Sequence, residues 1–134
     1  MNIVIENIAH DKHRIIDGVK YETVGDWKFD EWNNLMVKVS ELGDWRYNLL
    51  VGLHETIEAY LCKLRGIPEQ SITEFDMVFE LEREAGLHTE TEECGDSPDA
   101  PYRTEHQFAT KIEKMLADEL GVNWSDYDKA VCSL

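Results

Sequence analysis

The sequence has few cysteines and no long hydrophobic run. Its three cysteines, Cys62, Cys94 and Cys132, are widely spaced and form no C-x-x-C pair, so neither a disulfide framework nor a cysteine-rich zinc module is expected. No hydrophobic stretch approaches the roughly 20 residues of a membrane span, and the first eight residues lack the pattern of a signal peptide. We therefore expect a protein of the reducing cytoplasm without a membrane-spanning segment.

Positive charge is also scarce. Lysine and arginine total 13 against 28 aspartates and glutamates, which gives a net charge of −15. Binding of duplex nucleic acid requires clustered basic residues, and the sequence contains no such run, so this function is not expected. The acidity is compatible with solubility, with attraction of metal ions, or with imitation of nucleic acid toward a basic partner.

Two common catalytic motifs are absent as well. The eight glycines are scattered singly, so no glycine-rich phosphate-binding loop is present. There is no G-x-S-x-G elbow, and Cys62 and Cys132 lack the local signature of a catalytic cysteine. The sequence therefore favours neither phosphate-loop chemistry nor a serine or cysteine nucleophile.

The first third of the chain carries strand signals. With 134 residues, 43% of them hydrophobic, the chain is expected to form one α+β domain. Within residues 1–43, "NIVIENI" is β-prone, Asp17-Gly18 marks a hairpin turn, and "NLMVKVSEL" alternates in polarity. We expect "GDWKFDEWNN" to be a connection, either a turn or a short helix. These signals predict a small, mostly antiparallel N-terminal sheet.

Residues 44–121 are predicted to hold three main helices. Asp44 is a suitable N-cap for the first helix, which Gly66 should terminate. Ser71 opens a sequence that fits a capping box, so a second helix is expected to begin there.

A turn-rich acidic loop, residues 87–101, should separate the second helix from the third. The third helix is expected to run from about Tyr102 to Gly121. Residues 122–134 then form a C-terminal tail with room for one more short helical turn.

The first predicted helix combines a hydrophobic face with two polar residues at its edge. On a helical wheel, one sector holds seven hydrophobic residues: Leu49, Leu50, Leu53, Ile57, Tyr60, Leu61 and Leu64. His54 and Glu58 lie just beyond this sector, and hydrophobic residues resume past them at Val51 and Cys62. The polar sector across the helix holds Gly52, Thr56, Ala59 and Lys63. A buried carboxylate without a partner is strongly disfavoured, so His54 and Glu58 need an explanation.

A divalent metal ion explains this pair. Side chains four residues apart on a helix lie over one another and can reach one ion. Imidazole nitrogen and carboxylate oxygen are ordinary ligands of zinc and related ions. We therefore predict His54 and Glu58 as ligands of a divalent metal, zinc by its donor atoms, with Glu55 beside them as a general base.

A third ligand must come from elsewhere in the chain. His106 ranks first for its chemistry and Glu105 second for its place in the hydrophobic sector of the third predicted helix. Asp76, at the margin of the second predicted helix, ranks third. His10 and His13 lie in "AHDKHR" and are expected to be surface histidines of a loop.

The five residues "HETIE" resemble the active-site helix of the zincin metallopeptidases, whose motif is H-E-x-x-H. This resemblance implies that His54 is the first ligand, Glu55 the base and Glu58 the second ligand, where it replaces the second histidine of the motif. It also implies a zincin-like arrangement, in which the last strand of a small sheet leads into the motif helix.

Two longer stretches, "GDWRYNLLVGLHETIEAYLCKLRGI" and "DAPYRTEHQFATKIE", are similar to a family of small bacteriophage proteins. That similarity implies a phage or prophage context, and hence a host cytoplasm, but no activity. Together with the motif, it makes a metal-binding phage protein, with zincin-like hydrolase activity, the leading hypothesis.

Two other functions remain open. Glu55 and Glu58 form an E-x-x-E pair that resembles the all-α nucleotide pyrophosphohydrolases, in which such clusters bind magnesium bridged to phosphates. Asp76, Glu80 or Glu105 would complete the cluster, although the strand-rich first third argues against an all-α fold. The other function is a non-enzymatic acidic accessory protein that blocks a basic host partner, because residues 68–105 hold 12 acidic and 2 basic residues.

Overall fold

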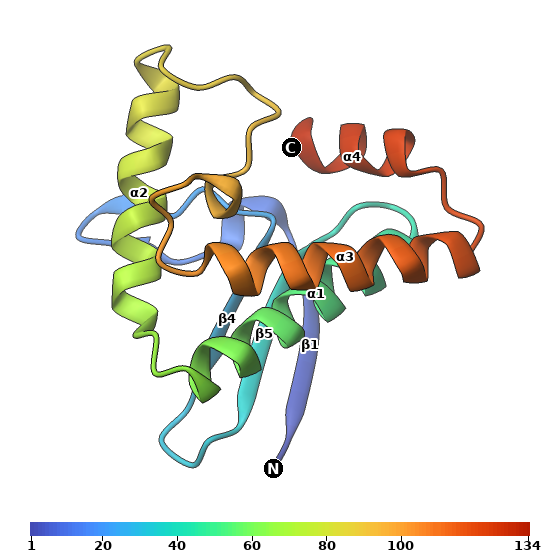
Figure 1. Ribbon diagram of the computed structural model, residues 1–134, viewed down its shortest axis with the longest axis horizontal. Coiled ribbons are helices and arrows are strands. Elements are labelled where there is room, and N and C mark those ends of the chain that lie inside the picture. Colours follow the sequence, from blue (N-terminus) through green and yellow to red (C-terminus); the bar gives the residue numbers. More distant parts are fainter.

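The computed structural model describes all 134 residues and contains a small sheet followed by four helices (Figure 1). The predicted α+β class is confirmed. The strands are β1 (Ile3–Ile8), β2 (Ile15–Ile16), β3 (Val19–Lys20), β4 (Gly25–Phe29) and β5 (Leu35–Ser40). The main sheet has the order β1-β5-β4, while β2 and β3 form a separate hairpin. Two of the three strand pairings are antiparallel, and β1 runs parallel to β5.

The central strand β5 shows the alternation that its sequence predicts. Leu35, Val37 and Val39 are fully buried, whereas Lys38 is exposed on the opposite face. Trp27 of β4 pairs with Val37 and is also buried. The hydrophobic core therefore lies on the face of the sheet from which these side chains project.

The prediction for "GDWKFDEWNN" is wrong, because its first five residues form strand β4. Trp27 is buried and Lys28 is exposed, as the two faces of a strand require. The strand is short and its outer face is polar, so the sequence alone does not reveal this alternation. The turn follows β4: the Asp30 carboxylate accepts the backbone N–H groups of Trp32 and Asn34. Asn33 takes the left-handed conformation, with φ of 62°, that such a turn requires.

The helices are α1 (Trp45–Leu64), α2 (Glu69–Glu84), α3 (Arg103–Glu119) and α4 (Trp124–Cys132). The predicted N-cap is confirmed, since the Asp44 carboxylate accepts the N–H of Arg46. Gly66 follows α1 with a φ of 67°, as a terminating glycine should. The predicted C-terminal tail, residues 122–134, contains helix α4, which is longer than the single short turn expected there. None of the four helices combines the length and the hydrophobicity that crossing a membrane requires.

Helix α2 begins two residues earlier than its sequence suggests. Pro68, with φ of −67°, occupies the N-cap position, and the helix starts at Glu69. The expected capping box is wrong: the Ser71 hydroxyl instead donates a hydrogen bond to the carbonyl of Pro68. Proline fits here because its fixed φ suits a helix start and its missing N–H is not needed there.

Helices α1 and α3 pack against each other in opposite directions, with α1 between α3 and the sheet (Figure 1). At one end Arg46 donates to the carbonyl of Leu120 at 3.4 Å. At the other end Arg65 forms an ion pair with Glu105 at 2.5 Å. This antiparallel pairing places the middle of α1 opposite the first turns of α3.

The buried face of α1 differs from the sector that the helical wheel suggested. Its buried residues are Asn48, Leu50, Val51, Gly52, His54, Glu58, Ala59 and Cys62. Leu64, by contrast, is 79% exposed. The reason is that α1 has two neighbouring layers, so it buries the residues that face the sheet and α3 rather than the centre of its leucine-rich sector.

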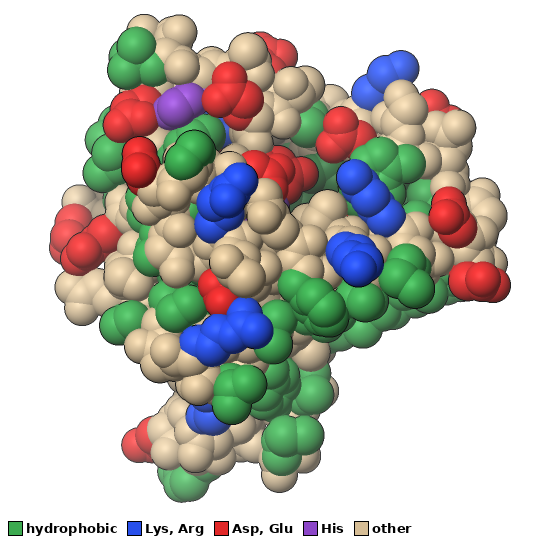
Figure 2. Space-filling view, viewed as in Figure 1, with side chains coloured by type: hydrophobic (Ala, Val, Ile, Leu, Met, Phe, Trp, Pro, Cys, Tyr) green, Lys and Arg blue, Asp and Glu red, His purple; other side chains and the backbone are tan.

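Helix α3 shows the same deviation. It buries polar residues such as Glu105, His106 and Glu113, whereas Phe108 and Met115 are 48% and 59% exposed. Hydrophobic side chains are visible along the lower side of α3 in Figure 2. The interface between α1 and α3 is therefore unusually rich in ionisable groups.

Gly52 lets α1 approach the sheet. A Cβ atom at this position would lie 2.8 Å from Cγ2 of Ile5 on β1. We predict that Gly52→Val lowers the free energy of unfolding by about 1–3 kcal/mol, because the added side chain overpacks this contact. Urea denaturation measures the change, and adding Ile5→Ala should recover part of the loss. An unchanged midpoint in the single variant would contradict this packing.

Candidate metal centre

Three predicted ligands come together between α1 and α3. His54 Nε2 lies 3.2 Å from Glu58 Oε2 and 3.1 Å from His106 Nδ1, and His106 Nδ1 lies 3.1 Å from the same Glu58 oxygen. All three residues are buried, with exposed fractions of 4–8%. The three atoms thus form a nearly equilateral triangle.

The size of this triangle suits a metal ion. A tetrahedral ion with bonds of about 2.0–2.1 Å holds its ligand atoms about 3.3–3.4 Å apart. The observed separations of 3.1–3.2 Å are within a few tenths of an ångström of that distance. An ion could therefore bind all three atoms after a slight outward movement of the side chains.

His54 is oriented from behind by a carboxylate. Its Nδ1 atom lies 2.8 Å from Oε1 of Glu113, and the Tyr127 hydroxyl of α4 donates to Oε2 of the same residue at 2.5 Å. A histidine ligand commonly donates its other N–H to a carboxylate in this way, which fixes the ring and its tautomer. Nε2 is thereby left to face the triangle.

His106 has an equivalent support. Its Nε2 atom lies 2.7 Å from Oε2 of Glu93, in the loop before α3. Gly95 packs directly on the imidazole ring, because a Cβ atom there would lie 2.3 Å from His106 Cγ. The short 3-10 turn Cys94–Asp96 therefore holds the ring in place, and only glycine allows this approach.

The third ligand, Glu58, is held by the sheet. Trp27 Nε1 of β4 donates to Glu58 Oε1 at 3.1 Å, which leaves Oε2 for the triangle. Burial alone would raise the pKa of Glu58, but hydrogen bonds from His106 and His54 outweigh it and lower the pKa to about 2. This carboxylate is therefore negatively charged at any physiological pH.

The two histidines have shifted pKa values for related reasons. Burial works against the charged form of each ring. For His54, hydrogen bonds with Glu113 and Glu58 outweigh burial and raise the pKa well above its usual value. For His106, hydrogen bonds with Glu58 and Glu93 raise the pKa to about 10. The carboxylates around these rings therefore favour their protonated forms when no cation is bound.

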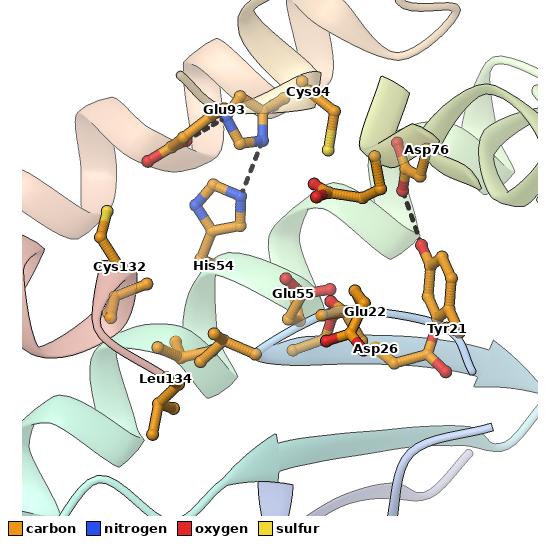
Figure 3. Close-up of a pocket in the computed structure, with 18 of the residues that line it drawn as sticks. Tyr21, Glu22, Asp26, His54, Glu55, Asp76, Glu93, Cys94, Cys132 and Leu134 are labelled. Carbon is orange, nitrogen blue, oxygen red and sulfur yellow. Dashed lines mark hydrogen bonds and ion pairs between the residues drawn. The ribbon is translucent and has the colours of Figure 1, made fainter. Parts of the chain in front are cut away.

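Glu55, the predicted base, lies beside the triangle and forms no hydrogen bond or ion pair with the protein. It is half-buried, and a Cβ atom on Gly25 would lie 2.8 Å from its Oε1, so its carboxylate lies over the start of β4. Burial, followed by the neighbouring charge of Glu58, raises the pKa of Glu55 well above its usual value. Figure 3 shows Glu55 next to Asp26, with His54 further along the pocket.

These residues line one cavity of about 610 Å³. Its walls come from β4, α1, α2, the loop before α3, and the end of α4. The triangle thus borders a space large enough for a small substrate, rather than being sealed in the core.

The two remaining ligand candidates lie outside the triangle. Glu105 is engaged by Arg65 of α1 in a 2.5 Å ion pair. Asp76 accepts hydrogen bonds from the hydroxyls of Tyr21 and Tyr102, at 2.6 and 2.5 Å. Each of these buried carboxylates therefore has its own protein partner, and of the three candidates only His106 completes the triangle.

Sequence reasoning missed the groups that orient the ligands. Glu113 could have been found, because it lies seven residues after His106 and hence on the same face of α3. Glu93 sits in an acidic loop where no periodicity marks one residue above another. Trp27 was hidden by the failure to recognise β4 as a strand.

The expectation of a surface histidine is wrong for His13. This residue is 4% exposed, and its Nε2 lies 2.9 Å from the buried Ser40 hydroxyl. His10 Nδ1 reaches the same hydroxyl at 2.9 Å. The pair therefore ties the 3-10 turn His10–Lys12 to β5.

Comparison of the chain with protein families, with curated proteins and with solved structures gave no match. We therefore infer the function of the protein from the geometry of the site.

Asp76 offers a pH-dependent test of this geometry. Burial is the largest influence on its carboxyl group and raises the pKa to about 6, despite hydrogen bonds from Tyr102 and Tyr21. Between about pH 4 and 6 the folded state then holds a proton that the unfolded state has lost, so this group makes stability fall as pH rises.

We predict that Asp76→Asn removes this decrease in stability with rising pH. Relative to the original protein, the free energy of unfolding of the variant should increase by about 2 kcal/mol between pH 4 and 7. Urea denaturation of both proteins across this range measures the difference, in which the titrations of all other groups largely cancel. If the difference in unfolding free energy between the two proteins stays flat or decreases as the pH rises, Asp76 cannot be a buried group with a raised pKa.

Proposed function

We propose that this protein binds one divalent metal ion, zinc by its donor atoms, through His54, Glu58 and His106, and that it is a metal-dependent hydrolase. The observation that carries the proposal is the triangle of three ligand atoms, each on a side chain that another residue holds from behind. Chance clusters of acidic and histidine residues rarely have every member oriented in this way, whereas metal ligands usually do.

The donor set favours zinc over magnesium. Two imidazole nitrogens and one carboxylate form a set used by catalytic zinc sites, which keep a fourth position for water or substrate. Magnesium prefers oxygen ligands and retains several waters. The E-x-x-E alternative also loses two of its proposed acidic residues, because Glu80 is paired with Arg83 and Glu105 with Arg65.

The position of Glu55 supports hydrolysis. Zinc supplies Lewis acidity and lowers the pKa of a water that it binds to about 7. Glu55 follows His54 on α1, and it lines the same cavity without a protein partner. It can accept a proton from the attacking water and deliver it to the leaving amine or alcohol as the scissile bond to the carbonyl carbon breaks.

Zinc binding is the first test. We predict that protein reconstituted with zinc retains one ion per chain, and that His54→Ala or His106→Ala abolishes this retention. Glu113→Gln should weaken zinc binding about 10- to 100-fold, because His54 loses its carboxylate partner. Elemental analysis and calorimetric titration measure these changes.

The matched control is His13→Ala, which removes an equally buried histidine outside the triangle. This variant should retain zinc. Loss of zinc in His13→Ala, or full retention in His54→Ala, would place the ion elsewhere, and a protein that never binds zinc would refute the proposal.

Hydrolysis is tested separately through Glu55. With zinc-loaded protein and a panel of fluorogenic peptide amides and esters, Glu55→Gln should reduce turnover about 10²- to 10⁴-fold while the zinc content stays at one ion. Turnover that survives both chelation and Glu55→Gln would exclude this mechanism. Stoichiometric zinc without turnover of any panel member would reject the hydrolase function and leave only the metal site.

A further inference from the structure

We infer that the substrate of this site carries a positive charge close to the bond that is hydrolysed, as in an amide next to a lysine or arginine side chain. The inference rests on the proposed function, since it assigns the substrate class of the same cavity. Three observations support it. The cavity wall is acidic, its two arginines are already paired with carboxylates, and three carboxylates line the cavity near the start of β4.

The cavity wall is strongly acidic. Ten aspartates and glutamates line it, against two arginines and no lysine. In Figure 2, acidic side chains are visible above α3, in the hollow between α4 and the loop that follows α2. Three of the ten carboxylates, Glu58, Glu93 and Glu113, belong to the triangle or contact its histidines. Even with one divalent ion and the two arginines, the wall holds more carboxylates than positive charges.

Both arginines of the wall are already neutralised. Arg14 forms a bidentate pair with Asp26, at 2.6 and 3.0 Å. Arg83 binds Glu80 through two nitrogens and also donates to the backbone carbonyls of Thr89 and Glu92. A phosphate or carboxylate of a substrate would therefore find no free cation in the cavity except the metal ion itself.

Three carboxylates gather where β4 begins. Figure 3 shows Glu22, Asp26 and Glu55 on one side of the pocket, and all three line the cavity. Arg14 compensates one of the three charges, and the nearest cation to Glu22 is Lys20, which is exposed and 3.8 Å away. The three carboxylates of this wall thus outnumber the two cations that lie beside them.

The arrangement places that wall next to the reacting position. Glu55 directly follows His54 on α1, about 100° further round the helix, and both side chains line the same cavity. A substrate whose scissile carbonyl lies at the metal ion would thus direct a neighbouring side chain toward Glu22 and Asp26. An ammonium or guanidinium group is attracted there, whereas an anionic group is repelled.

Three hydroxamates test this inference with zinc-loaded protein. The Nα-acetyl hydroxamates of lysine, norleucine and glutamate share a zinc-binding group and differ in side-chain charge. We predict that the lysine compound binds at least tenfold more tightly than the norleucine compound, and the glutamate compound most weakly. The preference should shrink in high salt and in Glu22→Gln, but not in Glu31→Gln, which removes an exposed carboxylate outside the cavity.

The two possible failures give different results. Binding of all three compounds with equal affinity, or tightest binding of the glutamate compound, would overturn the charge preference and leave the zinc site intact. Failure of every hydroxamate to bind, the norleucine compound included, would overturn the proposed zinc site and this inference with it.

Discussion

The pairing of α1 with α3 depends on charge balance inside the protein. Glu58 and Glu113 are buried between these helices with only the imidazoles of His54 and His106 to neutralise them. An uncompensated buried charge is strongly destabilising, by several kcal/mol in typical proteins. Protons on the histidines can supply the positive charge, and so can a divalent ion at the triangle. The same groups that make this interface costly are the ones that we propose as a metal site.

Most other elements of the fold contribute to holding this interface. Strand β4 delivers Trp27 to one oxygen of Glu58, α4 delivers Tyr127 to Glu113, and the turn before α3 presses Gly95 against His106. Helix α2 closes the cavity through Asp76. The proposed ligands are thus positioned by distant segments of the chain, which is the organisation that a functional site on rigid elements requires.

Local patterns predicted the elements well and their packing less well. Alternation identified β5, and capping residues identified both ends of α1, because these signals are confined to neighbouring residues. The wheel directed the leucine-rich sector of α1 inward, but the true buried face depends on the sheet and α3, which are set by tertiary structure. His54, Glu58 and His106 were predicted as ligands from spacing and chemistry, and the structure brings the three together, whereas Glu93 and Trp27 reach them only through the fold.

The central claim is that one ion occupies the triangle formed by His54, Glu58 and His106. A crystal structure of the zinc-reconstituted protein, with anomalous data collected on both sides of the zinc absorption edge, tests it directly. We predict one strong anomalous peak about 2.0–2.2 Å from His54 Nε2, His106 Nδ1 and Glu58 Oε2. A peak elsewhere, such as between Glu93 and Asp96, or no peak in zinc-saturated crystals, would contradict it.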